Sequence, residues 1–213
     1  MKFLLIVVLV LISYNFSTAQ ERKMNVAVLI YDGVYVLDFT GPIEVFTDTF
    51  INDTTNTFNV FTISTNTEMI TAHSGLNVIP DYTFSNCPDI DIFIIPGGNP
   101  GLINNDSNLK KEIIRIADKS KYTMSVCTGA FILAKTGMLD GLEATTWHGA
   151  LNRLQSLYPK IIVKSTRWTD NGKFLTTSGV SAGIDGSLYL VSKIFGKKIA
   201  DATAKYMDYE YWK

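Results

Sequence analysis

The chain is poor in the side chains that most often bind metals or form disulfide frameworks. It has 213 residues but only two histidines and two cysteines, Cys87 and Cys127. Because a structural zinc site uses about four such ligands held close together, we predict no metal site. Two cysteines allow at most one disulfide, and a Cys87–Cys127 bridge is the plain alternative to any reactive role for either residue.

The chain also lacks a block of charge of one sign. Its formal net charge is −1, and acidic and basic residues are interspersed along the sequence. Nucleic-acid binding therefore has no electrostatic support. The sequence contains no internal repeat and no low-complexity segment, and its length fits one domain.

Long apolar runs are absent except at the N-terminus. Lys2 precedes an apolar run over residues 3–12, and Ser17 and Ala19 are small residues at the −3 and −1 positions of a cleavage site. The run is shorter than the ~20 residues of a membrane span. We predict that residues 1–19 are a signal peptide and that the protein is exported to the periplasm or secreted, without membrane attachment after cleavage; an uncleaved anchor is the alternative.

Beyond this leader, short apolar strands alternate with helical patterns. Strands are predicted at residues 26–31, 58–64, 91–95, 122–126 and 174–177, and helices at residues 108–119, 131–135, 150–158, 181–195 and 198–212. A first helix is predicted to begin at Gly41-Pro42, with Glu44 in its first turn. Residues 69–72 and 76–79 predict a hairpin outside the main sheet. This alternation predicts one α/β domain over residues 25–212, a three-layer sandwich whose mostly parallel sheet has helices on both faces.

Several polar or glycine-containing segments follow the predicted strands. These are residues 32–40, 97–101, 127–128 and 177–181. Since ligands of parallel sheets bind beyond the carboxyl ends of the strands, we expect these segments to meet at one edge.

The most informative of these segments surrounds Cys127. A predicted strand leads into Ser125-Val126-Cys127-Thr128-Gly129 and a helix follows, which is the arrangement of a nucleophile elbow with cysteine as the nucleophile. The expected result is an exposed sulfur whose thiolate is favoured by the helix N-terminus. The amides of Thr128 and Gly98 are candidate donors to developing negative charge. The alternatives are a buried inert cysteine and, for Pro96-Gly97-Gly98, an ordinary turn.

Taken together, these motifs resemble the ThiJ/PfpI superfamily, and within it the isonitrile hydratases. The segments that carry the resemblance are residues 37–42, 87–88, 95–98, 125–129, 144–146 and 181–185. The resemblance implies a flavodoxin-like fold, similar to class I glutamine amidotransferases, and a homodimer without metal or organic cofactor. It also implies that Cys127 is the nucleophile and that Asp38 and Thr128 assist it; otherwise Asp38 reads as a loop carboxylate near a helix start.

The chemistry implied is water addition to a small isonitrile through a thioimidate, which gives an N-substituted formamide. Many members of the superfamily carry histidine directly after the cysteine, where this chain has Thr128. His148 follows Trp147, whereas relatives often carry histidine and then tryptophan, so His148 is expected to be a structural, hydrogen-bonded histidine. His73 is expected to lie on the surface. Two other functions stay open: a non-catalytic binding or sensor domain, and a cysteine hydrolase or glyoxalase/deglycase-type stress enzyme. The same fold occurs in AraC-type regulators, but a helix-turn-helix region is not expected here.

Overall fold

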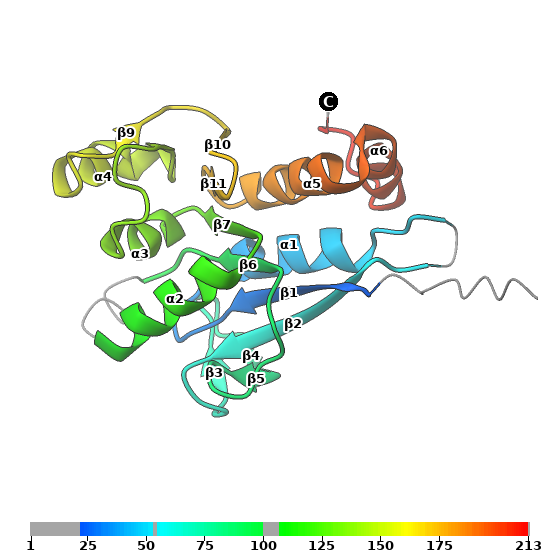
Figure 1. The fold of residues 1–213 in the computed structure, drawn as a ribbon, viewed down its shortest axis with the longest axis horizontal. Coiled ribbons are helices and arrows are strands. Elements are labelled where there is room, and N and C mark those ends of the chain that lie inside the picture. Colours follow the sequence, from blue (N-terminus) through cyan, green and yellow to red (C-terminus); the bar gives the residue numbers. More distant parts are fainter. Residues whose placement is uncertain (1–21, 53–54, 100–106, 213) are drawn as a thin grey trace, which may run out of the picture.

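A seven-stranded sheet organises the part of the chain that this computed structural model describes, residues 22–52, 55–99 and 107–212 (Figure 1). In spatial order its strands are β10 (Trp168–Asp170), β11 (Phe174–Thr177), β7 (Tyr122–Val126), β6 (Ile92–Ile95), β1 (Met24–Leu29), β2 (Phe58–Ser64) and β5 (Tyr82–Thr83). All neighbouring strands are parallel except β10, which pairs antiparallel with β11. The predicted mostly parallel sheet is confirmed.

Helices cover both faces of this sheet. The helices of the described part of the chain are α1 (Val36–Thr47), α2 (Ser107–Lys119), α3 (Gly129–Lys135), α4 (Leu151–Leu157), α5 (Ala182–Phe195) and α6 (Lys197–Tyr206), with a short 3-10 turn at His148–Ala150 that α4 contacts. Helices α1, α5 and α6 lie together on one face, and α2 and α3 lie on the other (Figure 1). The hydrophobic core lies between the sheet and these two groups of helices. Because both faces of the central strands are covered, their side chains are fully buried, as at Val26, Val28, Ile92 and Ile94.

Two small two-stranded sheets complete the fold. The predicted hairpin is confirmed as β3 (Ile70–Thr71) paired antiparallel with β4 (Asn77–Val78), outside the main sheet. The second pairs β8 (Glu143–Ala144) with β9 (Ile162–Val163) in parallel. Residues 1–19, the predicted signal peptide, lie outside the described residues. Within the described residues, no helix combines the length and the apolar content needed to cross a membrane.

The predicted start of the first helix is wrong. Helix α1 begins at Val36, and Pro42 lies inside it. Proline fits the first turn of a helix well, because its missing N–H would have no helical partner there, and this preference suggested a start at Gly41-Pro42. The correction matters for the site, because it moves Asp38 from a loop into the first turn of α1.

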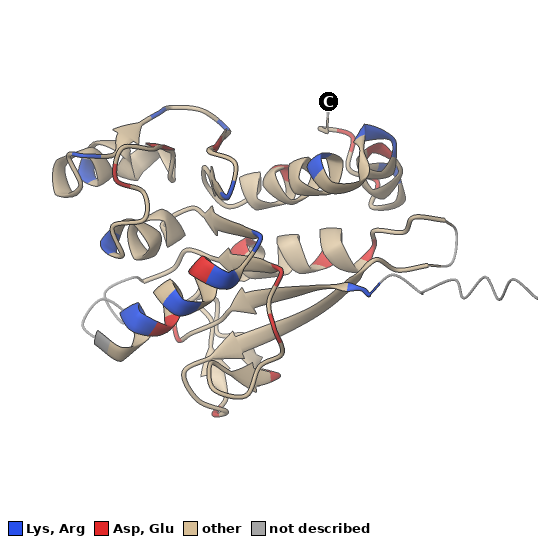
Figure 2. Cartoon of the chain, viewed as in Figure 1, with Lys and Arg blue, Asp and Glu red and all other residues tan. Residues whose placement is uncertain are grey.

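Acidic and basic residues are spread over the elements rather than gathered by sign (Figure 2). Helix α2, for example, carries both lysines and acidic residues, and Arg115 pairs with Glu112 on its surface. This distribution agrees with the nearly balanced composition of the chain.

Candidate active site

Cys127 lies on the sharp turn between β7 and α3. Its φ is 56°, which is unusual for a residue other than glycine. Its amide is directed at the end of β11, donating to the carbonyls of Ser178 (2.9 Å) and Thr177 (3.2 Å). The turn also needs a small residue at Gly129, because a side chain there would overlap the carbonyl of Ile95 on β6. The strand–turn–helix geometry predicted for the cysteine is therefore present.

Asp38 faces this turn from the first turn of α1. Its side chain is completely buried, and Oδ2 accepts a hydrogen bond from the Gly97 amide at 3.0 Å. Oδ1 accepts no conventional hydrogen bond from the described residues. The neighbouring group that interacts with the carboxyl is the Cys127 thiol. Burial raises the pKa of Asp38 to about 6, and the Gly97 amide and the thiol only partly oppose this rise.

The sulfur of Cys127 differs from the exposed thiolate that the sequence predicts. The residue is only 4% exposed, and burial followed by the negative charge of Asp38 raises the pKa of the thiol to about 11. Backbone amides of Val180 and Thr128 donate to the sulfur and lower the pKa, but by less. At neutral pH the sulfur is therefore protonated, and the carboxylate of Asp38 is the acceptor beside it.

Val180 is the donor that the sequence analysis missed. It lies in the Ser178–Ser181 segment between β11 and α5, and its φ of 40° is rare for a β-branched residue. Such a conformation costs about 1–3 kcal/mol unless the surroundings impose it. The sequence predicts that residues 177–181 lie at this edge of the sheet, but no side-chain motif indicates which backbone amide points at the sulfur.

The predicted role of Gly98 needs correction. The Gly98 amide donates a hydrogen bond to Thr128 Oγ1 at 3.0 Å. The Thr128 hydroxyl in turn donates to the carbonyl of Gly98 at 3.2 Å. Because an amide has a single hydrogen, that of Gly98 is not free for an oxyanion in this structure. The Thr128 hydroxyl instead fastens α3 to the turn after β6. A side chain at the adjacent Gly97 would come within 2.7 Å of both Thr128 Oγ1 and Asp38 Oδ2.

Tyr31 is a second residue that the sequence analysis missed. It is buried just beyond the end of β1, and its hydroxyl donates to the carbonyl of Pro96 at 3.0 Å. Burial raises the pKa of Tyr31, and the charges of Asp38 and Cys127 raise it further. The phenol therefore stays neutral and supports the turn that carries the Gly97 amide. The only indication of this role in the sequence is the position of Tyr31 at the end of a predicted strand.

Neither histidine approaches the sulfur closely enough to affect its pKa. His148 is exposed, and its ring lies 5.0 Å from that of Trp147. His73 is exposed on the small hairpin, as predicted, with its ring 4.5 Å from that of Tyr35. Among the described residues, no group of three or more His, Cys, Asp or Glu side chains is placed to hold a metal ion. Cys87 and Cys127 are both free thiols, so the alternative of a disulfide is not realised.

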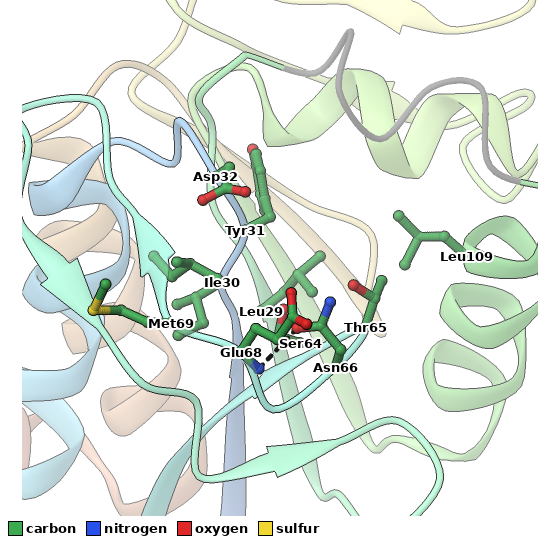
Figure 3. A pocket seen from close by; sticks show the side chains of 11 residues that line it. Leu29, Ile30, Tyr31, Asp32, Ser64, Thr65, Asn66, Glu68, Met69 and Leu109 are labelled. Carbon is green, nitrogen blue, oxygen red and sulfur yellow. Dashed lines mark hydrogen bonds between the residues drawn. The ribbon is translucent and has the colours of Figure 1, made fainter.

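A pocket of about 280 Å³ lies beside this centre, at the carboxyl ends of β1 and β2 (Figure 3). Tyr31 and Asp32 line it on one side, Glu68 and Met69 come from the segment after β2, and Leu109 of α2 faces them. Cys127 and Asp38 are not part of its lining. Tyr31 is the residue shared between this pocket and the surroundings of the sulfur.

Comparisons with known proteins match most of the chain. A family model described as the DJ-1/PfpI family matches residues 24–193. Isonitrile hydratase of Pseudomonas putida is 31% identical over 187 residues, which are 87% of this chain and 78% of that protein. The HTH-type transcriptional regulator GbdR of Pseudomonas aeruginosa is 26% identical over 70% of this chain, but the match spans only 41% of the regulator.

Solved structures show the same fold. A ThiJ/PfpI family protein from Pseudomonas syringae superposes with a TM-score of 0.79 at 26% identity, over 89% of this chain and 76% of that one. DJ-1beta of Drosophila melanogaster superposes with a TM-score of 0.76 at 17% identity, over 89% of this chain and all (100%) of that one.

Proposed function

Because the chain belongs to the DJ-1/PfpI family, as its motifs predict, we propose that it is a cysteine-dependent hydro-lyase of the isonitrile hydratase type. The observation that carries the proposal is the buried Cys127–Asp38 pair, in which a carboxyl with a pKa of about 6 interacts with a protonated thiol. A group with such a pKa can take up and return a proton near neutral pH. The similarity to isonitrile hydratase supports the substrate class.

The reaction begins with transfer of the thiol proton from Cys127 to Asp38. The sulfur then forms a bond to the terminal carbon of the isonitrile, R–N≡C, and Asp38 returns its proton to that carbon. The product of this step is the thioimidate R–N=CH–S–Cys127. The amides of Thr128 and Val180, which donate to the sulfur, stabilise its negative charge while it is ionised.

Hydration then completes the cycle. Asp38 removes a proton from water, the water oxygen bonds to the thioimidate carbon, and Asp38 passes this proton to the nitrogen, which gives R–NH–CH(OH)–S–Cys127. Asp38 then removes the remaining hydroxyl proton as the carbonyl forms. The carbon–sulfur bond breaks, the formamide R–NH–CHO leaves, and the sulfur regains the proton held by Asp38. The net reaction is addition of one water to one isonitrile, so no oxidant, reductant or cofactor is consumed. Export of the protein and its assembly as a homodimer remain predictions.

A non-catalytic ligand-binding domain is the second candidate. The thiol pKa of about 11 favours it, because a thiol that stays protonated is a weak nucleophile unless Asp38 removes its proton. The match to part of a transcriptional regulator agrees with a binding role. In that case a small molecule would stabilise the protein without being converted.

Turnover of cyclohexyl isocyanide by the purified protein separates these candidates. We expect N-cyclohexylformamide to form, and its formation to fall at least about 10³-fold in Cys127→Ala, since removal of a nucleophile eliminates the covalent route. Cys87→Ala is the matched control, because Cys87 is the other free thiol and lies outside the site; its activity should match that of the parent.

Equal activity of Cys127→Ala and the parent would overturn the proposal. Absence of turnover together with a ligand-dependent rise in melting temperature would support the binding domain. Conversion of methylglyoxal but not of the isonitrile would support the hydrolase or glyoxalase/deglycase alternative.

A further inference from the structure

The segment that carries the Val180 amide is fastened at both ends by a single residue, Arg167. The backbone carbonyl of Arg167 accepts a hydrogen bond from the Ser178 amide at 2.9 Å. Its guanidinium Nη2 donates to Ser181 Oγ at 3.0 Å. Val180 lies between these two contacts, in a backbone conformation that residues other than glycine rarely adopt. Such a conformation persists only where the surroundings hold it, and Arg167 supplies contacts on both sides.

The guanidinium of Arg167 is itself held in place by a buried carboxylate. Its Nε donates to Asp185 Oδ2 at 2.5 Å, and the Asp185 side chain is only 9% exposed. The other oxygen, Oδ1, accepts a hydrogen bond from the hydroxyl of Tyr209 at 3.0 Å. Asp185 lies in the first turn of α5, and Tyr209 comes from the segment after α6. The C-terminal segment is thus connected to the turn beside Cys127.

We infer that Arg167, oriented by Asp185 and Tyr209, is a positioning residue that keeps the Val180 amide on the sulfur of Cys127. The inference assigns a role to the 181–185 motif, which the proposed reaction does not use directly. It rests on the proposed function only in taking Cys127 as the reacting group. Its test measures the reactivity of the thiol itself, so a protein that does not hydrate isonitriles can still support or contradict it.

Alkylation of Cys127 by iodoacetamide, followed between about pH 7 and pH 11, provides the readout. All variants carry Cys87→Ala, so that Cys127 is the single thiol. Ser181→Ala removes the side-chain contact of Arg167 with the segment and leaves its backbone contact with Ser178 in place. The Ser181 hydroxyl makes no cap hydrogen bond to α5 that would also be lost. We expect the rate near neutral pH to fall about fivefold and the pH profile to move to higher pH, since a lost hydrogen bond to the thiolate disfavours it.

Asp185→Asn distinguishes positioning from a simple effect of charge. Removing a negative charge would by itself favour the thiolate and speed alkylation. Loss of the Arg167 orientation acts in the opposite direction, so the inference predicts slower alkylation. Asp38 and Tyr31, the other ionisable groups coupled to Cys127 electrostatically, are unchanged in this variant.

Asp170→Asn is the matched control for Asp185→Asn. Asp170 also accepts hydrogen bonds from one basic residue and one tyrosine, Lys193 and Tyr189 of α5, but it does not contact the Ser178–Ser181 segment. Its alkylation profile should equal that of the parent. If Asp185→Asn does not fold, as judged by its melting temperature, Ser181→Ala and Tyr209→Phe carry the test. Parental profiles in both of these variants, or faster alkylation in a folded Asp185→Asn, would overturn the inference.

Discussion

At the scale of single residues, the proposed chemistry depends on how Asp38 and Cys127 divide one proton. The pKa of the carboxyl is about 6 and that of the thiol about 11, so near pH 8 the proton resides mainly on sulfur and the carboxylate is ionised. The negative charge of Asp38 is, after burial, the main cause of the raised thiol pKa. Asp38 therefore suppresses spontaneous ionisation of Cys127, and in the proposed reaction it is also the base that ionises the thiol when a substrate is present.

Because Asp38 both raises the pKa of the thiol and accepts its proton in the proposed reaction, Asp38→Asn should have opposite effects on alkylation and on hydration. The amide keeps an oxygen that can accept the Gly97 hydrogen bond but carries no charge, so the pKa of Cys127 should fall. Alkylation by iodoacetamide near pH 8 should become about tenfold faster, as expected for a thiol pKa about one unit lower. Hydration of the isonitrile should nevertheless fall at least about 10²-fold, because the amide cannot carry the proton. Both rates are measured on the same preparation.

The control for this variant is Asp32→Asn. Asp32 follows β1 at the same edge of the sheet but is exposed, and it is not among the groups that shift the pKa of Cys127. Both of its rates should equal those of the parent. Slower alkylation in Asp38→Asn would contradict the electrostatic account of the thiol.

Much of the site could be predicted at this scale, but its protonation state could not. The cysteine motif and the family resemblance identify Cys127, Asp38 and Thr128 as neighbours. The pKa of each group depends instead on burial and on backbone amides from other strands. The roles of Tyr31 and Val180 are of this second kind, because each follows from its place at a strand end and not from its side-chain pattern.

At the scale of elements, the site depends on how closely α3 approaches β6. Helix α3 begins at Gly129, and a side chain there would overlap the carbonyl of Ile95. The sequence predicts this contact through the small residue two positions after the nucleophile. The prediction from sequence was wrong for the start of α1. Proline inside a helix looks like a helix start when the preceding residues carry no capping signal. The N-cap residue of α1, Tyr35, indeed makes no side-chain cap hydrogen bond.

Gly129→Ala tests the close approach. The added methyl group can be accommodated only if α3 moves away from β6, so we expect the free energy of unfolding to fall by about 3 kcal/mol, at the upper end for overpacking. Gly137→Ala is the control: Gly137 has a φ of 86°, but a methyl group there would meet no atom within 4 Å. Backbone strain alone should lower the free energy of unfolding of Gly137→Ala by about 1 kcal/mol. Urea unfolding followed by circular dichroism gives both values, and equal losses would contradict the role of close packing.

At the scale of the whole molecule, the order of strands explains why residues far apart in sequence meet. Strands β11, β7, β6 and β1 are neighbours and run parallel, so their carboxyl ends bring Val180, Cys127, Gly97 and Tyr31 to one edge. The alternation of strands and helices in the sequence predicts this edge. It could not predict which pairs of groups touch, because that depends on strand neighbours as well as strand direction.

Export is the remaining prediction at this scale, and the burial of Cys127 is compatible with it. Oxidation of a cysteine requires an accessible thiolate, whereas Cys127 is 4% exposed and has a thiol pKa of about 11. We therefore expect an exported protein to keep Cys127 as a free thiol.

When the full chain is expressed in a bacterium, the periplasmic protein should begin at Gln20. After denaturation, iodoacetamide should alkylate both free thiols, and peptide mass spectrometry should show one added group on the peptide that contains Cys127. Ala19→Arg should block cleavage, because the −1 position requires a small residue. Thr18→Gln, at the position between the two small residues, should leave cleavage unchanged. A full-length cytoplasmic product from the parent would contradict export, and a disulfide or sulfonic acid at Cys127 would show that burial does not protect it.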